Sequence, residues 1–479
     1  MDAFRQDISE LQRMMTNGET TSKNLTMMYL QQIASYDQNG PNINAILEIN
    51  PDALHTAEAL DVERKRDGTR GPLHGIPIIV KDNIDTGDKM HTSAGSVALE
   101  HHYAKQDAFL VKQLRDAGVI ILGKSNLTEW ANFITEGMPN GYSSRGGQVL
   151  NPYGPGQFDV GGSSSGSAAA VASQFAAGAI GTETSGSILS PASSNSVVGL
   201  KPTVGLISRT GIIPIANSQD TAGPITKTVE DAAVLLGALV GIDDEDSATK
   251  MSRGRYVPDY TKYLQTTSLQ GARIGVDRGY LESLDEEELT LIEQAIENMQ
   301  KQGAEIVDIT ITTENRDSSV MFHEFKNGLN AYLSTCSEQV PVHTLHELIQ
   351  YNEEHADVAL RYGQTLFTAA EEKSGTLTEP EYLLDRLGDI QYSQKEGIDR
   401  VMKEHSLEAI LFANNLGAGI AAMAGYPSIS VPAGFTATDG KPVGLTLTSM
   451  AFQETQLLSL AYAYEQTSRV MRKSPSVTE

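Results

Sequence analysis

The sequence predicts an α/β fold in which helices sandwich a β-sheet. Residues 76–80 form an uninterrupted apolar run, which is typical of a strand buried on both faces, as in a parallel sheet. An amphipathic helix expected over 108–117 is followed by an apolar strand at 119–123. A second helix expected over 285–302 is likewise followed by a strand at 304–309. This alternation of helices and strands is the pattern of α/β proteins.

The composition is that of an ordinary globular protein with a sizeable core. The chain has 479 residues, of which 40% are hydrophobic and 20% are charged. Its 43 glycines and 18 prolines are spread along the chain and do not cluster as a linker. Length alone would suggest about three average domains, although large α/β enzymes also fold as one.

Charge and cysteine content limit the expected partners and compartment. With 36 Lys and Arg against 61 Asp and Glu, the formal charge is −25, which repels nucleic-acid phosphates and anionic membranes. Cys336 is the single cysteine, so an intramolecular disulfide cannot form, and the N-terminal stretch has no apolar signal core. No uncharged apolar run approaches the ~18 residues of a membrane span. We expect a cytoplasmic protein that binds neither nucleic acid nor membranes.

Residues 1–70 are predicted to be helical. From the cap residue Ser22 to Tyr36, apolar residues recur at steps of three and four, and a further helix is expected over 51–66. The first buried strand then ends at Lys81, where it leaves the core. A lysine at a strand end usually keeps its ammonium group in water, so this position alone does not make Lys81 catalytic.

The stretch from Gly161 to Pro191 places two hydroxyl-bearing loops around one compact helix–strand unit. Two glycines and a run of serines open it, a small-residue helix and a short apolar strand follow, and a loop rich in Thr, Ser and Gly closes it. An acyl-transfer enzyme needs this layout, because a hydroxyl nucleophile must lie beside backbone N–H groups that can hold an oxyanion.

The last third of the chain begins with a polar, helical section from Glu314 to His405 that has no strand pattern. In an α/β enzyme such a section often covers the site and selects the substrate. Strand signals return at 426–432 and 443–447, and a final helix is expected over 454–469 on the flank of the sheet.

Short motifs offer other chemistries, and each lacks the context that it needs. Residues 162–166 match G-x-S-x-G, the nucleophile elbow of α/β-hydrolases, with Ser164 as nucleophile, but the loop-like residues 154–158 stand where that motif needs a strand. The same glycines lack the ending of a phosphate loop. The S-x-x-K match at 247–250 has no companion motifs. No metal is predicted, because no ligand spacing occurs among the histidines at 74, 91, 101 and 102.

Together, Lys81 and the two serine-rich loops resemble the amidase signature family. The core pattern of that family is G-G-S-S-[GS]-G, then about two dozen residues, then G-[ST]-[DE]-x-[GSD]-G-S-[IV]. Residues 161–166 and 181–188 meet this pattern, and Ser163 and Ser187 stand 24 positions apart. The resemblance covers most of the chain, and its further matches lie at 75–77, 80–83, 123–129, 198–203 and 424–427.

This resemblance implies a fold and a domain organisation. The family fold is a single domain with a large, twisted, mixed β-sheet sandwiched between helices. Here it would span residues 1–479, with an N-terminal helical region at 1–70, a catalytic core at 71–240 and a substrate-covering section at 314–405.

The resemblance also implies a catalytic site without metal or cofactor. The family's Ser-cisSer-Lys triad corresponds to Ser187 as nucleophile, Ser163 as the bridging serine after a cis peptide bond from Gly162, and Lys81 as base. The oxyanion hole would consist of backbone N–H groups of Ser187 and of the three residues before it, Thr184, Ser185 and Gly186. An ordinary lysine, with a pKa of ~10.4, is neutral in only about one molecule in 2,500 at pH 7. The base must therefore be desolvated, and the apolar run before Lys81 could do this.

Two positions depart from the pattern of many family members. Ser185 stands in place of a Gly, which the hole tolerates unless that residue needs a positive φ, and Leu189 stands in place of an Arg. With Glu183 and the run 201–209, Leu189 looks most like the bacterial peptide amidase branch, which removes ammonia from C-terminal peptide amides. Residues 130–133 and 144–148 also look like that branch.

The sequence thus predicts an amidohydrolase that acts on primary carboxamides, in particular peptide C-terminal amides, as a monomer or homodimer. The substrate would be a small-molecule or peptide amide. A broad amidase for aryl or alkyl amides is an alternative. The glutaminase subunit of a tRNA-dependent amidotransferase is another, and the missing Arg and the acidic charge speak against it. The presence of Lys81, Ser163 and Ser187 speaks against a non-catalytic homologue.

Overall fold

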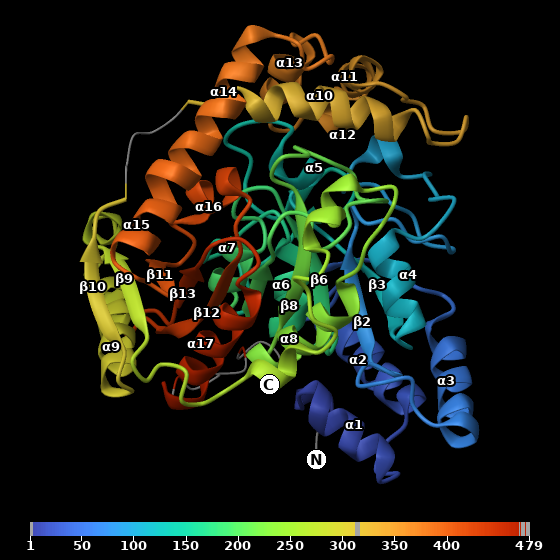
Figure 1. Ribbon diagram of the computed structural model, residues 1–479. Coiled ribbons are helices and arrows are strands. Elements are labelled where there is room, and N and C mark those ends of the chain that lie inside the picture. Colours follow the sequence, from blue (N-terminus) through green and yellow to red (C-terminus); the bar gives the residue numbers. More distant parts are fainter. Residues whose placement is uncertain (1–2, 312–316, 469, 471–474, 476–479) are drawn as a thin grey trace.

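The structure, a computed structural model, describes residues 3–311, 317–468, 470 and 475 (Figure 1). Its centre is one mixed sheet with the strand order β1-β3-β2-β6-β8-β7-β12-β13-β11-β9-β10, and β4 pairs separately with β5. The strands are β1 Ile46–Ile49, β2 Pro77–Lys81, β3 Ile120–Ser125, β4 Tyr142–Ser143, β5 Gly147–Gln148, β6 Gly178–Glu183, β7 Val198–Lys201, β8 Thr221–Thr226, β9 Arg273–Asp277, β10 Glu305–Ile309, β11 Ala409–Ala413, β12 Ser428–Phe435 and β13 Pro442–Thr448.

Helices surround this sheet. They are α1 Ile8–Thr16, α2 Ser22–Tyr36, α3 Ala53–Asp67, α4 Phe109–Asp116, α5 Glu129–Asn132, α6 Ser165–Ala172, α7 Leu189–Ser194, α8 Val229–Leu239, α9 Glu286–Lys301, α10 Val320–Leu333, α11 Leu345–Glu354, α12 Ala356–Ala359, α13 Thr365–Glu371, α14 Pro380–Ile390, α15 Asp399–Glu404, α16 Ala418–Ala424 and α17 Glu454–Thr467. A π-helical stretch, Gln391–Ile398, joins α14 to α15. Within residues 3–311 and 317–468, no helix has both the length and the apolar character that crossing a membrane requires.

The predicted buried strand is confirmed as β2. All five of its residues are buried, and it runs parallel to β3 on one side and β6 on the other. The other predicted helix–strand units are confirmed as α4–β3 and α9–β10, and the strand β9 precedes α9. Further along the sheet β6, β8, β7, β12, β13 and β11 pair antiparallel, so the sheet is mixed, as expected.

Small residues let helices approach both faces of β6. A Cβ on Gly181 would lie 2.8 Å from the Oγ of Ser164, directly before α6, whereas a Cβ on Gly178 would lie 3.1 Å from Leu235 of α8. Positions three apart in a strand face opposite sides. Helix α6 therefore lies on one face of the sheet and α8 on the other, as the sandwich prediction requires.

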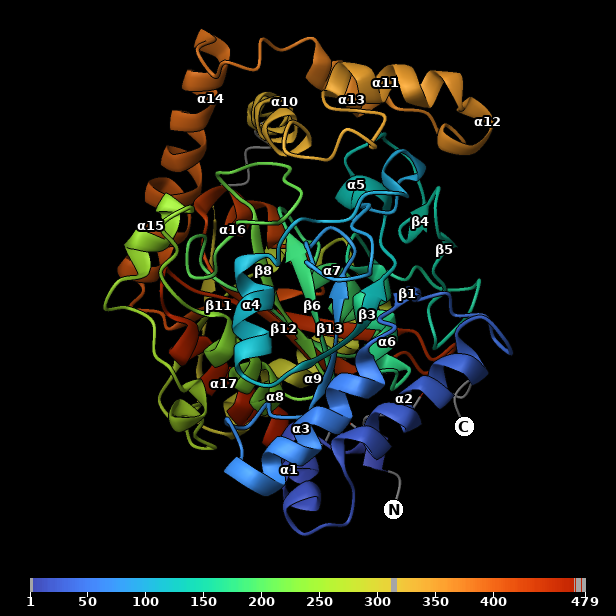
Figure 2. The ribbon, with the colours of Figure 1, turned by 90° about the vertical axis from the view of Figure 1, so that its right-hand side faces the viewer.

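The polar section after β10 is helical, as predicted. Residues 314–316 of the predicted range lie outside the described residues, and from residue 317 onward the section folds into α10 to α15. Helices α10 to α13 lie across one end of the sheet, and α14 descends beside it (Figures 1 and 2). The section thus covers the end of the sheet where β2 and β6 stop.

Two boundaries differ from the sequence-based expectation. The region 1–70 contains one strand, β1, which pairs antiparallel with β3 at the sheet edge. The four residues, ILEI, do not alternate between apolar and polar, and only one of them is buried. No strand periodicity therefore marks this segment in the sequence, and the pairing with β3 decides its conformation. The last helix, α17, ends at Thr467, and Arg469, where it was expected to end, lies outside the described residues.

Candidate active site

Three neighbouring segments bring Lys81 and Ser163, two of the predicted catalytic residues, together. Lys81 is the last residue of β2, and the parallel strand β6 ends at Glu183, directly after Thr182, on the same edge of the sheet. The loop before α6 carries Ser163 to this edge, where its Oγ meets the Lys81 amine. Because the carboxyl ends of adjacent parallel strands meet at one edge of a sheet, the order of these elements places the side chains side by side.

The Lys81 amine is enclosed by oxygen atoms of hydroxyl and carbonyl groups. Its Nζ lies 2.8 Å from Ser163 Oγ, 3.0 Å from Ser164 Oγ, 2.9 Å from Thr182 Oγ1 and 3.2 Å from the Thr182 carbonyl oxygen. The side chain is fully buried. Burial lowers the pKa of Lys81 from 10.5 to about 7, and the charges of Glu183 and Asp220 oppose this shift from a distance. The neutral amine is therefore far more populated near neutral pH than in an ordinary lysine.

The first loop is tightly fitted around Ser163. The peptide bond from Gly162 to Ser163 is cis. A Cβ on Gly161, where φ is +69°, would lie 2.6 Å from the backbone atom Pro191 Cα, so this position requires glycine. A Cβ on Gly162 would lie 2.4 Å from Asn140 Oδ1, so a larger residue there would displace that side chain. The backbone N–H of Ser164 donates to the Ser187 carbonyl oxygen at 3.0 Å. This bond ties the first loop directly to the predicted nucleophile.

The second loop presents the predicted oxyanion residues 184–186 before Ser187. Gly186 has a φ of +82°, whereas Ser185, in the described part of the chain, is not among the residues with positive φ. The Ser in place of Gly at position 185 therefore carries no left-handed strain. Thr184 Oγ1 donates to Asp220 Oδ1 at 2.6 Å, which fixes the start of the loop. Ser187 keeps 7% of its surface exposed.

Glu183 fixes the end of this loop. Its Oε2 accepts hydrogen bonds from the backbone N–H groups of Ile188, at 2.7 Å, and Leu189, at 3.0 Å. These are two donors that the start of α7 would otherwise leave unpaired. The carboxylate at the end of β6 therefore holds the two residues that follow Ser187.

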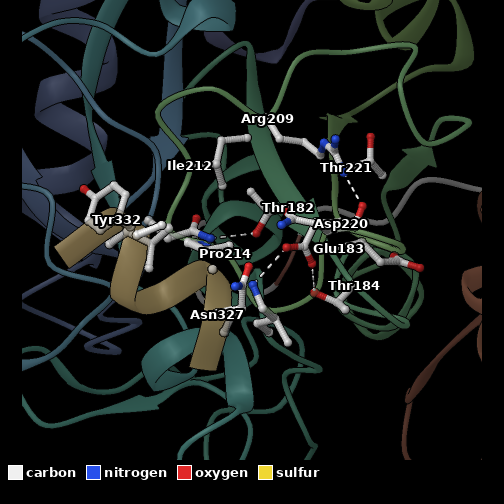
Figure 3. Close-up of a pocket in the computed structure, with 17 residues that line it drawn as sticks. Thr182, Glu183, Thr184, Arg209, Ile212, Pro214, Asp220, Thr221, Asn327 and Tyr332 are labelled. Atoms are coloured by element: carbon white, nitrogen blue, oxygen red, sulfur yellow. Dashed lines mark hydrogen bonds between the residues drawn. The ribbon is translucent and has the colours of Figure 1, made fainter. Parts of the chain in front are cut away.

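A cavity of about 230 Å³ opens beside β6 (Figure 3). It is lined by Thr182–Thr184, by the segment 209–221 that leads into β8, and by α10. Ala131 also lines it, from a segment in which Trp130, Ala131 and Asn132 have φ values of 51°, 53° and 71°. Helix α10, from the helical section after β10, thus lines this cavity.

Sequence reasoning missed several contacts of this site. Thr182 and Ser164 contact the amine directly, and both stand inside the family motifs, but the motifs give no direction for their side chains. Asn83, two residues after Lys81, donates from Nδ2 to Thr182 Oγ1 at 3.0 Å. Asp220 is brought in by the return of the chain along β8, and no local signal marks it.

Ser164 does not have the setting of a nucleophile elbow. Its Oγ donates to the Thr182 carbonyl oxygen at 3.0 Å and accepts from the Thr182 N–H at 3.2 Å. The residues 154–158 before it form turns and no strand. The strand that this motif needs before its serine is thus absent at residues 154–158, as the sequence indicated.

Known proteins share this fold and sequence over nearly the full length. Residues 24–372 match the Amidase family. The structure superposes on the native peptide amidase of Stenotrophomonas maltophilia with a TM-score of 0.93 and 44% sequence identity, over 98% of each chain. A probable amidase of Arabidopsis thaliana is 40% identical over 95% of this chain and 88% of its own. A glutamyl-tRNA(Gln) amidotransferase chain from Thermoanaerobacter pseudethanolicus is 32% identical over 100% of this chain and 99% of its own.

These matches define the class of the protein as a hydrolase that acts on amide C–N bonds. Within that class, the chain belongs to the amidase signature family. The predicted family, fold and enzyme class are therefore confirmed.

Proposed function

We propose that the protein removes ammonia from the C-terminal amide of peptides through an acyl-enzyme on Ser187. The observation that carries this proposal is the fully buried Lys81 amine, 2.8 Å from Ser163 Oγ, with a pKa lowered to about 7 by burial. Such an amine can take a proton at neutral pH, and a base of this pKa is well matched to general base catalysis.

The proton relay would run through three side chains. Neutral Lys81 takes the proton of Ser163 as Ser163 takes that of Ser187, and Ser187 Oγ attacks the amide carbonyl. The N–H groups of residues 184–187 hold the negative charge that develops on the carbonyl oxygen. Ser163, reprotonated from Lys81, then protonates the leaving nitrogen, and ammonia departs. Water hydrolyses the acyl-enzyme by the same relay in reverse.

Peptide amides are the favoured substrates for two reasons. The identity to the S. maltophilia peptide amidase, 44%, exceeds the 32% to the amidotransferase chain. Leu189 also places an uncharged side chain where many family members have Arg, which would otherwise attract a substrate carboxylate. A broad aryl or alkyl amidase remains the alternative that the same assay tests.

The test is ammonia release from acetyl-leucinamide, glutamine, benzamide and a fatty amide, with the parent protein and with Ser187→Ala. The peptide amide should be the fastest substrate, and Ser187→Ala should lower its turnover by about 10⁴-fold or more while the protein stays folded. Ser190→Ala, which removes the same atom three positions further on, is the control and should stay close to the parent. Substantial turnover by Ser187→Ala would exclude Ser187 as nucleophile, and a faster reaction with glutamine would exclude the peptide amide.

A further inference from the structure

The predicted oxyanion loop, residues 184–187, has backbone N–H groups that donate to no protein acceptor within the part of the chain that the structure describes. Its end is fixed by other bonds. The Ser164 N–H donates to the Ser187 carbonyl oxygen, and Glu183 accepts from the two N–H groups that follow Ser187. The four N–H groups of the loop thus remain available for a developing negative charge, and their position also depends on how the start of the loop is held.

The oxyanion loop begins where two strands of the sheet separate. The antiparallel pairing of β6 with β8 ends at Glu183 and Thr221, so Thr184 and Asp220 are the next pair of residues. Side chains join this pair, because Thr184 Oγ1 donates to Asp220 Oδ1 at 2.6 Å (Figure 3). Both side chains are buried. The bond extends the strand pairing by one position and sets the direction in which the loop leaves the sheet.

The second carboxylate oxygen of Asp220 binds a different part of the chain. Asp220 Oδ2 accepts hydrogen bonds from the backbone N–H groups of Ile215, at 2.8 Å, and Ala216, at 2.9 Å. Both residues belong to the segment 213–218, which we call the wall segment because it lines the cavity beside β6. One side chain therefore connects the oxyanion loop to the wall segment.

The wall segment is also held by contacts that do not involve Asp220. At its start, the Ile213 N–H donates to the Asn83 carbonyl oxygen at 2.9 Å. At its end, the Ser218 N–H donates to Glu324 Oε2 of α10 at 2.8 Å. The wall segment is thus a fixed support, and Asp220 attaches the start of the oxyanion loop to it.

The Asp220 carboxylate is ionised in the pH range where the Lys81 amine is neutral. Burial raises the pKa of Asp220 to about 6, and the hydrogen bonds from Thr184 and Ile215 and the charge of Arg209 oppose a larger shift. An ionised carboxylate only accepts hydrogen bonds, and its bonds are stronger than those of a neutral acceptor. Above pH 7 the carboxylate can therefore hold the loop and the wall segment together.

We propose that Asp220 is a positioning residue for amide hydrolysis, which holds the start of the oxyanion loop against the wall segment so that the N–H groups of residues 184–187 meet the developing oxyanion. Asp220 acts through Thr184 and not on the substrate. The inference rests on the proposed acyl-enzyme mechanism and adds to it the residue that preorganises the oxyanion hole. These N–H groups would bind the transition state more strongly than the bound substrate, so their misplacement lowers kcat and leaves KM nearly unchanged.

The experiment measures kcat and KM for ammonia release from acetyl-leucinamide in two variants. Thr184→Val removes the hydroxyl and keeps the size of the side chain, and Asp220→Asn replaces the charged acceptor by a neutral amide. Thr184→Val should lower kcat by about 10- to 100-fold, less than the ~10²–10³-fold loss from removing an oxyanion donor outright. Asp220→Asn should lower it in the same direction, and KM should change by less than about threefold in both. At pH 8.5, on the plateau of the pH profile, a shift in the Lys81 pKa does not affect the comparison.

Two further variants are controls. Thr184→Ser restores the hydroxyl without the methyl group and should recover most of the kcat that Thr184→Val loses. Asp37→Asn matches Asp220→Asn in burial, because the buried Asp37 carboxylate also accepts two backbone N–H groups, those of Ala45 and Ile46. A loss of stability that comes from neutralising a buried aspartate should occur in both aspartate variants, whereas only Asp220→Asn should lower kcat.

The outcomes separate this inference from the proposed function. A Thr184→Val protein with the kcat of the parent, or with a raised KM and an unchanged kcat, overturns the inference and leaves the proposed function standing. A Thr184→Ser protein as slow as Thr184→Val, or a folded Asp220→Asn protein as fast as the parent, also overturns it. If Asp220→Asn does not fold, the Thr184 pair alone decides. A folded parent that releases no ammonia from acetyl-leucinamide overturns the proposed function and the inference with it.

Discussion

Lys81 and Lys124 lie one register position apart on the neighbouring strands β2 and β3, and their side chains leave opposite faces of the sheet. In the parallel register of β2 and β3, Val80 is opposite Lys124 and Lys81 is opposite Ser125. Neighbouring residues of a strand point to opposite faces, so the two amines leave opposite sides of the sheet. Both side chains are fully buried, and burial lowers the pKa of each.

The surroundings of the two amines differ. Lys81 faces hydroxyl groups that can pass protons, with its carboxylates at a distance. Lys124 Nζ donates to the Ile84 carbonyl oxygen at 2.6 Å and to Thr92 Oγ1 at 3.0 Å. The charges of Asp82 and Asp85 oppose the lowering of the Lys124 pKa. Burial alone therefore does not make a base. Lys81 contacts three hydroxyls that can pass a proton onward, whereas Lys124 contacts one carbonyl oxygen and one hydroxyl and lies near more carboxylate charges.

The largest effect is expected for Lys81→Met. Turnover of acetyl-leucinamide should fall by about 10⁴-fold, because the relay loses its base. In the parent, kcat/KM should rise with pH to a plateau above about pH 7, since the Lys81 amine is neutral above its pKa of about 7. A profile that is flat between pH 6 and 8, or a Lys81→Met protein with a tenth of the parent activity, would assign the base to another group.

The same variant should be no less stable than the parent near neutral pH. Because the folded pKa of Lys81 is below its ordinary value of 10.5, holding this amine destabilises the folded state at any pH below 10.5. That destabilisation grows as pH falls from 10.5 to 7 and is constant below 7. The difference in thermal midpoint between Lys81→Met and the parent should therefore grow as pH falls over that range.

The opposite behaviour is expected for Lys124→Met. Removing this amine takes away a charge near the buried Asp82 and Asp85, and because Lys124 forms no ion pair with either of them in the described structure, the loss should stay below the ~3–5 kcal/mol of a broken buried ion pair. Burial raises the pKa of Asp85 from 3.8 to about 6, so acid neutralises this group more readily in the folded state. The loss should be full above pH 6 and smaller at pH 4 to 5. Urea unfolding of the parent and the variant at pH 8 and at pH 5 measures the loss in free energy of unfolding at each pH.

A second substitution separates charge from packing in this prediction. Asp85→Asn in the Lys124→Met background should recover part of the lost stability at pH 8, because one of the uncompensated carboxylates is gone. If the double variant is as unstable as Lys124→Met, the charge of Lys124 does not stabilise the fold and its role is packing. The difference between Lys81 and Lys124 would then not come from the groups that surround each amine.

The contrast between the two lysines shows how far the sequence could lead. The buried run 76–80, the spacing of Ser163 and Ser187 and the βα units are local patterns, and they predicted β2, the two loops and the α/β fold correctly. Lys81 and Lys124 both end or nearly end an apolar run, and no local pattern tells them apart. Only the family resemblance chose Lys81.

What the sequence could not supply depends on long-range packing. The strand face of each lysine is decided by the register of β2 with β3, and the hydroxyl of Thr182 reaches Lys81 across 101 positions of the chain. The α10 wall of the cavity meets the loop 209–221 where Gly328 approaches Pro214, at 3.1 Å from the position of an added Cβ. Such contacts arise when separate elements pack, so no periodicity within either element encodes them.

The smallest effect is expected for Ser164→Ala, which removes one of the hydroxyls around Lys81 and leaves the rest. One hydrogen bond to a charged group contributes about 1.5–3 kcal/mol, and Ser163 and Thr182 still contact the amine. Activity at pH 8 should stay within about tenfold of the parent. Since Ser164 Oγ accepts from the Lys81 ammonium at 3.0 Å, its loss should lower the Lys81 pKa further and shift the acidic limb of the pH profile to lower pH.

Ser167→Ala is the matched control, because this buried serine of α6 bonds to Ser125 and does not contact the Lys81 amine. It should leave the acidic limb in place. If Ser164→Ala abolishes turnover while Ser187→Ala retains it, the nucleophile is Ser164, and the hydroxyls around Lys81 activate the first loop and not the second.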